Sequence, residues 1–210
     1  HKLHILSWSG TFLSVHCEGL TIAIENEPAM FVKPVKPDNT LRPVYFPFGS
    51  LAHLQKLVTE IDRENVSLAF DCAHRAVSQL IPSFITREEL VDKFFPKESL
   101  TQMLFESLNC STWEKYRQLQ GKLDTWLEVA SVYHLSNTTG IGVHLSEEEQ
   151  TFWGADGTFE GYFSREQLKR ILEKASQNNK TTIIEVEMDL GNKTFQEPFD
   201  FLKFLKHNNV

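Results

Sequence analysis

The residues best suited to chemistry meet in one short stretch, VSLAFDCAHRAVSQL, at positions 66–80 of this 210-residue chain. A short apolar run ends there at Asp71, and Cys72 and His74 follow where a helical pattern begins. The carboxyl ends of strands are common places for active sites in α/β proteins. A carboxylate, a thiol and an imidazole at such a point indicate a Cys–His or an Asp–His pair, and a nucleophilic cysteine would need a base within reach.

The same three residues also have a structural interpretation, which we favour. Asp71 is a preferred N-cap residue, and its charge suits the N-terminal end of a helix. Cys72 belongs to the residue types that are most often buried. In a helix, His74 projects about 200° away from Cys72, so a direct pair within this segment is not expected. If the protein is an enzyme, we expect Asp71, Cys72 and His74 to be joined by His144.

Sequence patterns typical of metal or cofactor binding are missing. His144 lies in GIGVHLSEEE, where the glycines have neither the spacing nor the lysine of a phosphate-binding loop. The three cysteines show no C-x-x-C spacing that would predict zinc. The segment 154–161 offers only Asp156 and Glu160 as calcium ligands. We therefore expect no metal ion and no cofactor.

Large aromatic residues lie outside regular hydrophobic periodicity in two places. One is a proline-rich segment, expected to be an extended edge or a connecting arm, that carries Tyr45, Phe46 and Phe48. The other is a glycine-rich segment expected to be a loop, which carries Phe152 and Trp153. Aromatic side chains in loops are typical of recognition surfaces, although they also serve as plugs into the core. We predict that these five residues contact a protein partner.

Composition narrows the class of protein. A net charge of −7, with no cluster of basic residues, argues against nucleic-acid binding. No apolar run reaches the roughly 18 residues of a membrane-spanning helix, so membrane insertion is not expected. Three cysteines favour a reducing, intracellular compartment, either cytoplasmic or nuclear. Five Asn-x-Ser/Thr triplets, at Asn65, Asn109, Asn137, Asn179 and Asn192, keep secretion open, because such triplets are glycosylated in secreted chains.

The pattern along the chain predicts an α+β fold. Three β-like stretches separated by Ser9-Gly10 and Glu18-Gly19 predict an N-terminal antiparallel meander. A central helical segment follows, and a capping box at residues 111–114 predicts that the longest helix begins there. A capping box at residues 146–149 predicts a short helix, and one at residues 164–167 opens a C-terminal helix–strand–hairpin–helix unit.

The helix–strand unit occurs twice in a similar form. An ungapped alignment of Ser50 with Ser164 pairs Leu54 with Leu168 and Asn65 with Asn179. We therefore treat the chain as a single compact α+β domain, 1–210, with possible related halves, 1–71 and 146–210, flanking a helical insert, 72–145. A duplicated helix–strand unit occurs in proteins of different functions, so the repeat does not indicate a function.

These observations favour a non-enzymatic protein–protein interaction domain or a subunit of a larger assembly. Two alternatives stay open. One is a small hydrolase or transferase that uses the Cys/His/Asp residues named above. The other is a ligand-binding regulatory domain with a pocket under the 136–163 segment.

Overall fold

The computed structural model describes residues 2–6, 12–16, 21–27, 30–34, 42–44, 50–87, 97–138, 140–145, 149–155 and 161–184, together with Lys203, Lys206 and His207. These residues form a mixed α and β fold with three sheets, which confirms the mixed class that the sequence predicts. None of the described helices is both long enough and apolar enough to cross a membrane.

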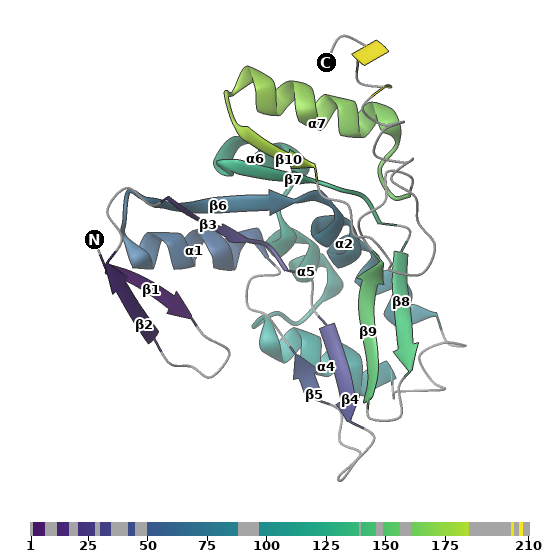
Figure 1. The fold of residues 1–210 in the computed structure, drawn as a ribbon. Coiled ribbons are helices and arrows are strands. Elements are labelled where there is room, and N and C mark those ends of the chain that lie inside the picture. Colours follow the sequence, from purple (N-terminus) through teal and green to yellow (C-terminus); the bar gives the residue numbers. More distant parts are fainter. Residues whose placement is uncertain are drawn as a thin grey trace.

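A parallel sheet organises the fold (Figure 1). Its strands, in spatial order, are β3 (Ile22–Glu25), β6 (Val66–Asp71), β7 (Val132–Leu135) and β10 (Thr181–Ile184). Every pair of neighbouring strands is parallel. The carboxyl ends of β3, β6 and β7 therefore lie at the same edge of the sheet.

The main hydrophobic core covers one face of this sheet. Helices α1 (Leu51–Ile61), α6 (Leu123–Val129) and α7 (Arg165–Gln177) supply Leu54, Trp126 and Leu168 to it. The sheet supplies Phe70 and Tyr133. Because strand side chains alternate between faces, Ala69 and Asp71 point to the opposite face from Phe70.

Helix α2 (Cys72–Thr86) starts directly after β6 and joins two cores. Cys72 and Ala76 belong to the core on the sheet. Farther along the helix, Ile81, Phe84 and Ile85 belong to a second cluster with α4 (Lys97–Ser107) and α5 (Trp113–Gln120). Within that cluster the Tyr116 hydroxyl donates to the Ser78 carbonyl at 2.8 Å. The first turn of α2 is thus fixed at the carboxyl edge of the sheet.

Two antiparallel sheets complete the described structure. A hairpin pairs β1 (Lys2–Leu6) with β2 (Phe12–His16). The other sheet has the order β5 (Arg42–Val44), β4 (Met30–Pro34), β9 (Glu149–Ala155) and β8 (Gly140–Leu145). Figure 1 shows this second sheet beyond the carboxyl ends of β6 and β7.

The strand pairings correct several predictions. The N-terminal meander holds only for β1 and β2, because β3 pairs in parallel with β6. Part of the proline-rich segment is a central strand, because β4 lies between β5 and β9 and carries its proline at its last residue. The predicted helix at residues 146–149 is wrong at its end, since Glu149 begins β9.

The helical segment also departs from prediction. The helix predicted from the capping box at residues 111–114 is two helices, α5 and α6, and the longest helix described is α2. The break is at Gly121, whose φ of 71° is left-handed and whose α-carbon lies so close to Leu51 that a Cβ would be 2.6 Å from Cδ2. A capping box at residues 86–89 predicts a further helix, which lies outside the described residues. Asp71 and Ser164 are N-caps as predicted, and Ser164 forms a complete capping box.

The repeated helix–strand unit has a third example in the structure. Ser50 and Ser164 both cap helices that are followed by a strand, as the alignment predicts. Both strands belong to the parallel sheet. Helix α6 followed by β7 has the same arrangement, inside the segment 72–145 that was expected to be a helical insert. That segment therefore contributes β7 to the parallel sheet and β8 to the four-stranded antiparallel sheet.

Candidate functional site

Three chemically active side chains meet at the carboxyl edge of the parallel sheet. Glu25 is the last residue of β3, Asp71 is the last residue of β6, and His134 lies one residue before the end of β7. Asp71 is directly opposite His134 in the register, and Glu25 is opposite Ala69. Because Ala69 and Asp71 share a face, all three side chains lie on the face that the main core leaves uncovered.

A buried asparagine fixes this edge. The side chain of Asn26 accepts a hydrogen bond from the backbone N–H of Asp71 at 2.7 Å and donates one to the Asp71 carbonyl at 3.1 Å. Through these two bonds, the Asn26 side chain continues the hydrogen bonding between β3 and β6 one residue past the end of β3. Glu25, the preceding residue, is held beside Asp71 as a result.

Glu25 lies between two imidazoles. Its Oε1 atom is 3.1 Å from Nδ1 of His134 and 3.5 Å from Nδ1 of His74. Nδ1 of His74 is also 2.7 Å from the carbonyl oxygen of Asn26. A carbonyl oxygen only accepts, so in the neutral imidazole this bond assigns the proton to Nδ1 and the lone pair to Nε2.

Asp71 is the buried member of the cluster. One carboxylate oxygen caps α2 by accepting from the His74 N–H at 2.7 Å. The other accepts from the Ser136 hydroxyl at 3.5 Å and lies 4.0 Å from Nδ1 of His134. Its position and charge are therefore set by the sheet, by the helix and by the residue that follows β7.

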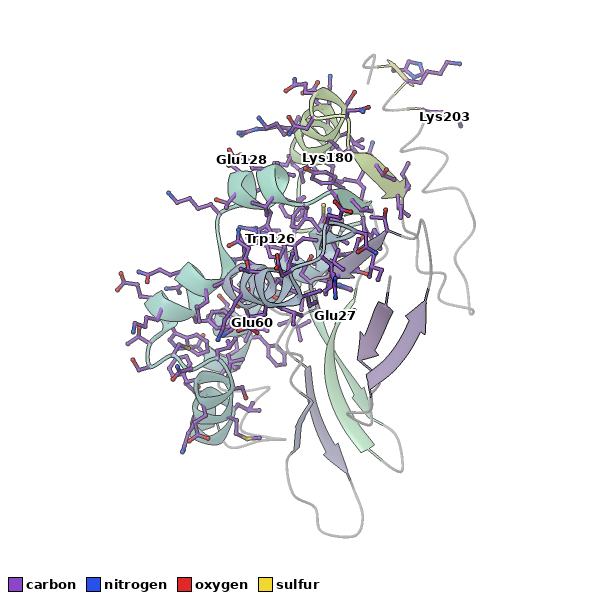
Figure 2. All side chains as sticks on the ribbon, turned by 90° about the vertical axis from the view of Figure 1, so that its left-hand side faces the viewer. Glu27, Glu60, Trp126, Glu128, Lys180 and Lys203 are labelled. Carbon is purple, nitrogen blue, oxygen red and sulfur yellow. The ribbon has the colours of Figure 1, made fainter. Side chains whose placement is uncertain are left out.

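The rest of the cluster is open to solvent. The Asp71 side chain is 2% exposed, whereas the side chains of His134 and Glu25 are 19% and 27% exposed. Glu27, at 38%, lies 3.8 Å from His74, and Figure 2 shows it on the side of the second sheet, away from Trp126 in the core. A ligand can therefore reach these donors from solvent.

The donor atoms lie close enough to one another to hold a cation. One ligand atom each from Glu25, Asp71 and His134 lies within 4.8 Å of the other two, and within the described ranges this is the group with that property. Two carboxylate oxygens and one imidazole nitrogen suit Zn²⁺, Mn²⁺ or Fe²⁺. The arrangement also suits acid–base chemistry, because a histidine that is hydrogen-bonded to a carboxylate is a common proton acceptor.

Cys72 faces away from this cluster. Its side chain is fully buried in the core beneath the sheet. Burial, together with the charge of Asp71, raises the pKa of the thiol well above its ordinary value, although Arg75 and a hydrogen bond with the Ser136 backbone act in the opposite direction. A neutral, enclosed thiol is a poor nucleophile, so the structure brings Asp71 and His74 together and leaves Cys72 outside.

The other predicted site residues lie in the second sheet or outside the described residues. His144 lies in β8 opposite Thr151, and its side chain is not among those described. Phe152 and Trp153 lie in β9, between β4 and β8, and not in a loop as predicted. Tyr45, Phe46 and Phe48 fall outside the described residues, as do Asp156 and Glu160.

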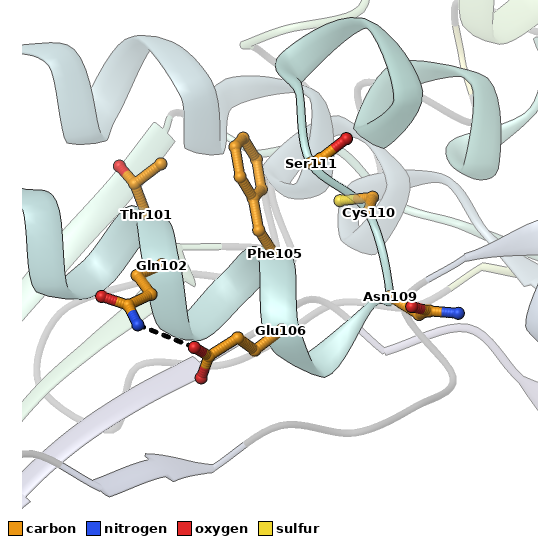
Figure 3. Close-up of a pocket in the computed structure, with 7 residues that line it drawn as sticks. All are labelled: Thr101, Gln102, Phe105, Glu106, Asn109, Cys110 and Ser111. Atoms are coloured by element: carbon orange, nitrogen blue, oxygen red, sulfur yellow. Dashed lines mark hydrogen bonds between the residues drawn. The ribbon is translucent and has the colours of Figure 1, made fainter.

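Two surface hollows lie on other parts of the described structure. The larger, with a volume of about 780 Å³, lies on α4 and the turn that leads to α5, and Figure 3 shows its residues Phe105, Glu106 and Cys110. Its carboxylate at Glu106 accepts a hydrogen bond from Gln102 at 2.7 Å. The smaller, of about 450 Å³, is a groove of charged residues between α6 and α7. The hydrogen bond or ion pair described in each hollow, Gln102 with Glu106 and Arg170 with Asp124, joins no nucleophile to a base.

Comparison with protein-family models, with curated proteins and with solved structures finds no match to this chain.

The sequence contained a signal for the residues that were missed, namely Glu25, Asn26 and His134. Polar residues end the apolar stretches LTIAIEN and SVYHLS in the same way that Asp71 ends VSLAFD. Their meeting follows only if all three strands are parallel neighbours. The predicted meander assigned the third stretch, which contains Glu25, to an antiparallel partner and so separated Glu25 from Asp71.

The burial of Cys72 leads to a labelling prediction. Native protein treated with iodoacetamide near neutral pH should remain unlabelled at Cys72, because the thiol is enclosed and its pKa is raised. Cys110, which is partly exposed, should react faster. Mass spectrometry of the two peptides measures both rates, and labelling in denaturant gives the reference for each. Labelling of native Cys72 at the rate of Cys110 would contradict the account and restore the cysteine as a candidate nucleophile.

Proposed function

We propose that the protein is a metal-dependent hydrolase whose divalent cation is held by Glu25, Asp71 and His134. The observation that carries the proposal is the convergence of three donor atoms, from the ends of three adjacent strands, to within 4.8 Å of one another. The cysteine-based hydrolase considered from the sequence is replaced by one that needs no thiol.

The number and type of donors support a catalytic site over a purely structural one. Catalytic zinc sites typically have three protein ligands and leave a position for water or substrate. Glu25 and His134 are partly exposed, so that position would face solvent. A divalent cation would also offset the repulsion between the carboxylates of Glu25 and Asp71.

Neighbouring groups would support the ligands. Asn26 holds the backbone of Asp71, and Ser136 donates to its carboxylate. Such outer partners orient metal ligands, and their loss typically weakens metal affinity about 10–100-fold. His134 lies 3.1 Å from Glu25, and a cation bound between these side chains would take the place of that hydrogen bond.

The chemistry that follows is activation of water. A bound divalent cation lowers the pKa of its water ligand and so makes it a nucleophile near neutral pH. We assign the role of proton acceptor to His74, because its Nδ1 proton is engaged by the Asn26 carbonyl and its Nε2 carries the lone pair. Cys72 has no part in this scheme.

A protein–protein interaction domain is the second candidate function. Ile183 and Ile184 on β10, the last described strand of the parallel sheet, are 45% and 36% exposed, and an edge strand can pair with an added strand of a partner. Its test is Trp153→Ala and Phe46→Ala, at residues assigned to partner contacts from the sequence. Loss of co-purifying protein from these variants at an unchanged melting temperature supports this function. If both variants keep the parental melting temperature and all co-purifying protein, this function is contradicted.

The metal proposal predicts a defined pattern of variants. The parent should bind one Mn²⁺ or Zn²⁺ per chain, measured by calorimetric titration of chelator-treated protein. Glu25→Gln, Asp71→Asn and His134→Gln should each weaken binding at least about tenfold, because each removes a ligand. Asp71→Asn is the most informative variant, since Asn still caps α2 and the fold should be kept. Hydrolysis of p-nitrophenyl phosphate and p-nitrophenyl acetate should require the added metal and fall in the same variants.

Asp124→Asn is the matched control. Asp124 is an exposed carboxylate that pairs with Arg170 at 3.3 Å, so its loss should leave metal affinity and hydrolysis unchanged. Equal metal affinity in the parent and in all three ligand variants would contradict the proposal. Metal binding without metal-dependent hydrolysis of either ester would keep the site and contradict the activity.

A further inference from the structure

Arg75 carries a positive charge that the described structure does not neutralise. Its guanidinium donates one hydrogen bond, from an Nη atom to the Gly121 carbonyl at 3.3 Å. Its Nε atom is buried and has no hydrogen-bond partner, and within the described part of the chain Arg75 forms no ion pair with a carboxylate. By comparison, Arg170 is exposed and pairs with Asp124.

The residue lies one helical turn along α2 from Asp71, a ligand of the candidate metal site. Arg75 is in the first turn of α2, four residues after Asp71, which is a rise of about 6 Å along the helix. The thiol of Cys72 is influenced by the charges of both Asp71 and Arg75, which places it near both. The ring of Tyr162, 42% exposed, also lies near enough to interact electrostatically with Arg75.

An arginine without a counter-ion and with an unbonded, buried N–H lowers the stability of the folded protein. A buried guanidinium N–H without a partner loses its hydrogen bond to water and gains none in return. A partly buried charge without a counter-ion adds a desolvation cost, and burial does lower the pKa of Arg75 from its ordinary value. The missing partner is thus an acceptor with negative charge.

We propose that Arg75 binds an anionic oxygen of the substrate and that the substrate is a phosphate ester. The planar fork of arginine donors matches a phosphate group in two-point geometry. A phosphate ester carries anionic oxygens on the atom that is attacked, so one group can meet both the cation and Arg75. The assignment of the ester rests on the proposed hydrolase function, whereas phosphate binding by Arg75 does not.

The test uses inorganic phosphate as the probe, titrated calorimetrically with and without Mn²⁺. Arg75→Met keeps the apolar stem and removes the charge, and Arg170→Gln is the control at an exposed arginine. Arg75→Met should weaken phosphate binding at least tenfold, leave Mn²⁺ affinity unchanged, and melt at or above the temperature of the parent. The last expectation holds because an unpaired buried charge has been removed. Arg170→Gln should bind phosphate like the parent.

Each other outcome overturns the inference. Phosphate binding by Arg75→Met at parental affinity removes Arg75 from the anion site, and so does a parent that binds no phosphate in either condition. A large fall in the melting temperature of Arg75→Met, with parental phosphate binding by the uncharged Arg75→Gln, assigns the residue to the fold through its bond to Gly121. If phosphate binding depends on Arg75 but no metal binds, the hydrolase proposal fails and the anion site stands.

Discussion

The parallel register of β3, β6 and β7 is the constraint on which the site depends. It brings residues that are 45 positions apart in sequence, Asn26 and Asp71, into direct contact. The Asn26 side chain closes this edge with two hydrogen bonds to the Asp71 backbone, both buried. A shift of one residue in that register would move Glu25 to the face occupied by the core, because strand side chains alternate. The pairing thus decides where the charged groups lie.

One face of the parallel sheet packs against the main core, and the other face carries the cluster of Glu25, Asp71 and His134. Phe70 and Tyr133 pack against α1, α6 and α7 on the core face. The Tyr133 hydroxyl, the polar group that these two side chains bring into the core, donates a hydrogen bond to the Leu127 carbonyl. On the other face, at the carboxyl edge, lie Glu25 and Asp71, the last residues of β3 and β6, and His134, one residue before the end of β7. Residues at the start of α2 contact both the core and the charged cluster. Cys72 packs into the core, Asp71 and His74 face the cluster, and Arg75 turns toward Gly121. One helical turn thereby fixes a proposed metal ligand, a proposed base and a proposed anion-binding residue relative to one another.

Local features were predictable from the sequence, and the tertiary pairing was not. Asp71 and Ser164 cap helices as predicted, because capping depends on a few neighbouring residues. The sequence signal of β3 is the same whether its partner is parallel or antiparallel, and the Gly-containing pairs favoured hairpins. β7 was missed, since a strand of four residues leaves little periodicity. The break at Gly121 depends on the contact with Leu51, which lies far away in sequence. Glu25 and His134 could not be joined to Asp71 for these reasons, although Asp71 and His74 were singled out.

Anomalous diffraction from crystals soaked in ZnCl₂ tests the central claim most directly, because it locates the cation without relying on a variant. Data collected on both sides of the zinc absorption edge should show one strong peak at the carboxyl edge of the parallel sheet. We predict bonds of about 2.0–2.2 Å from that peak to a carboxylate oxygen of Glu25, to one of Asp71 and to an imidazole nitrogen of His134. No peak at these three side chains, or a peak bonded to other residues in their place, would contradict the account.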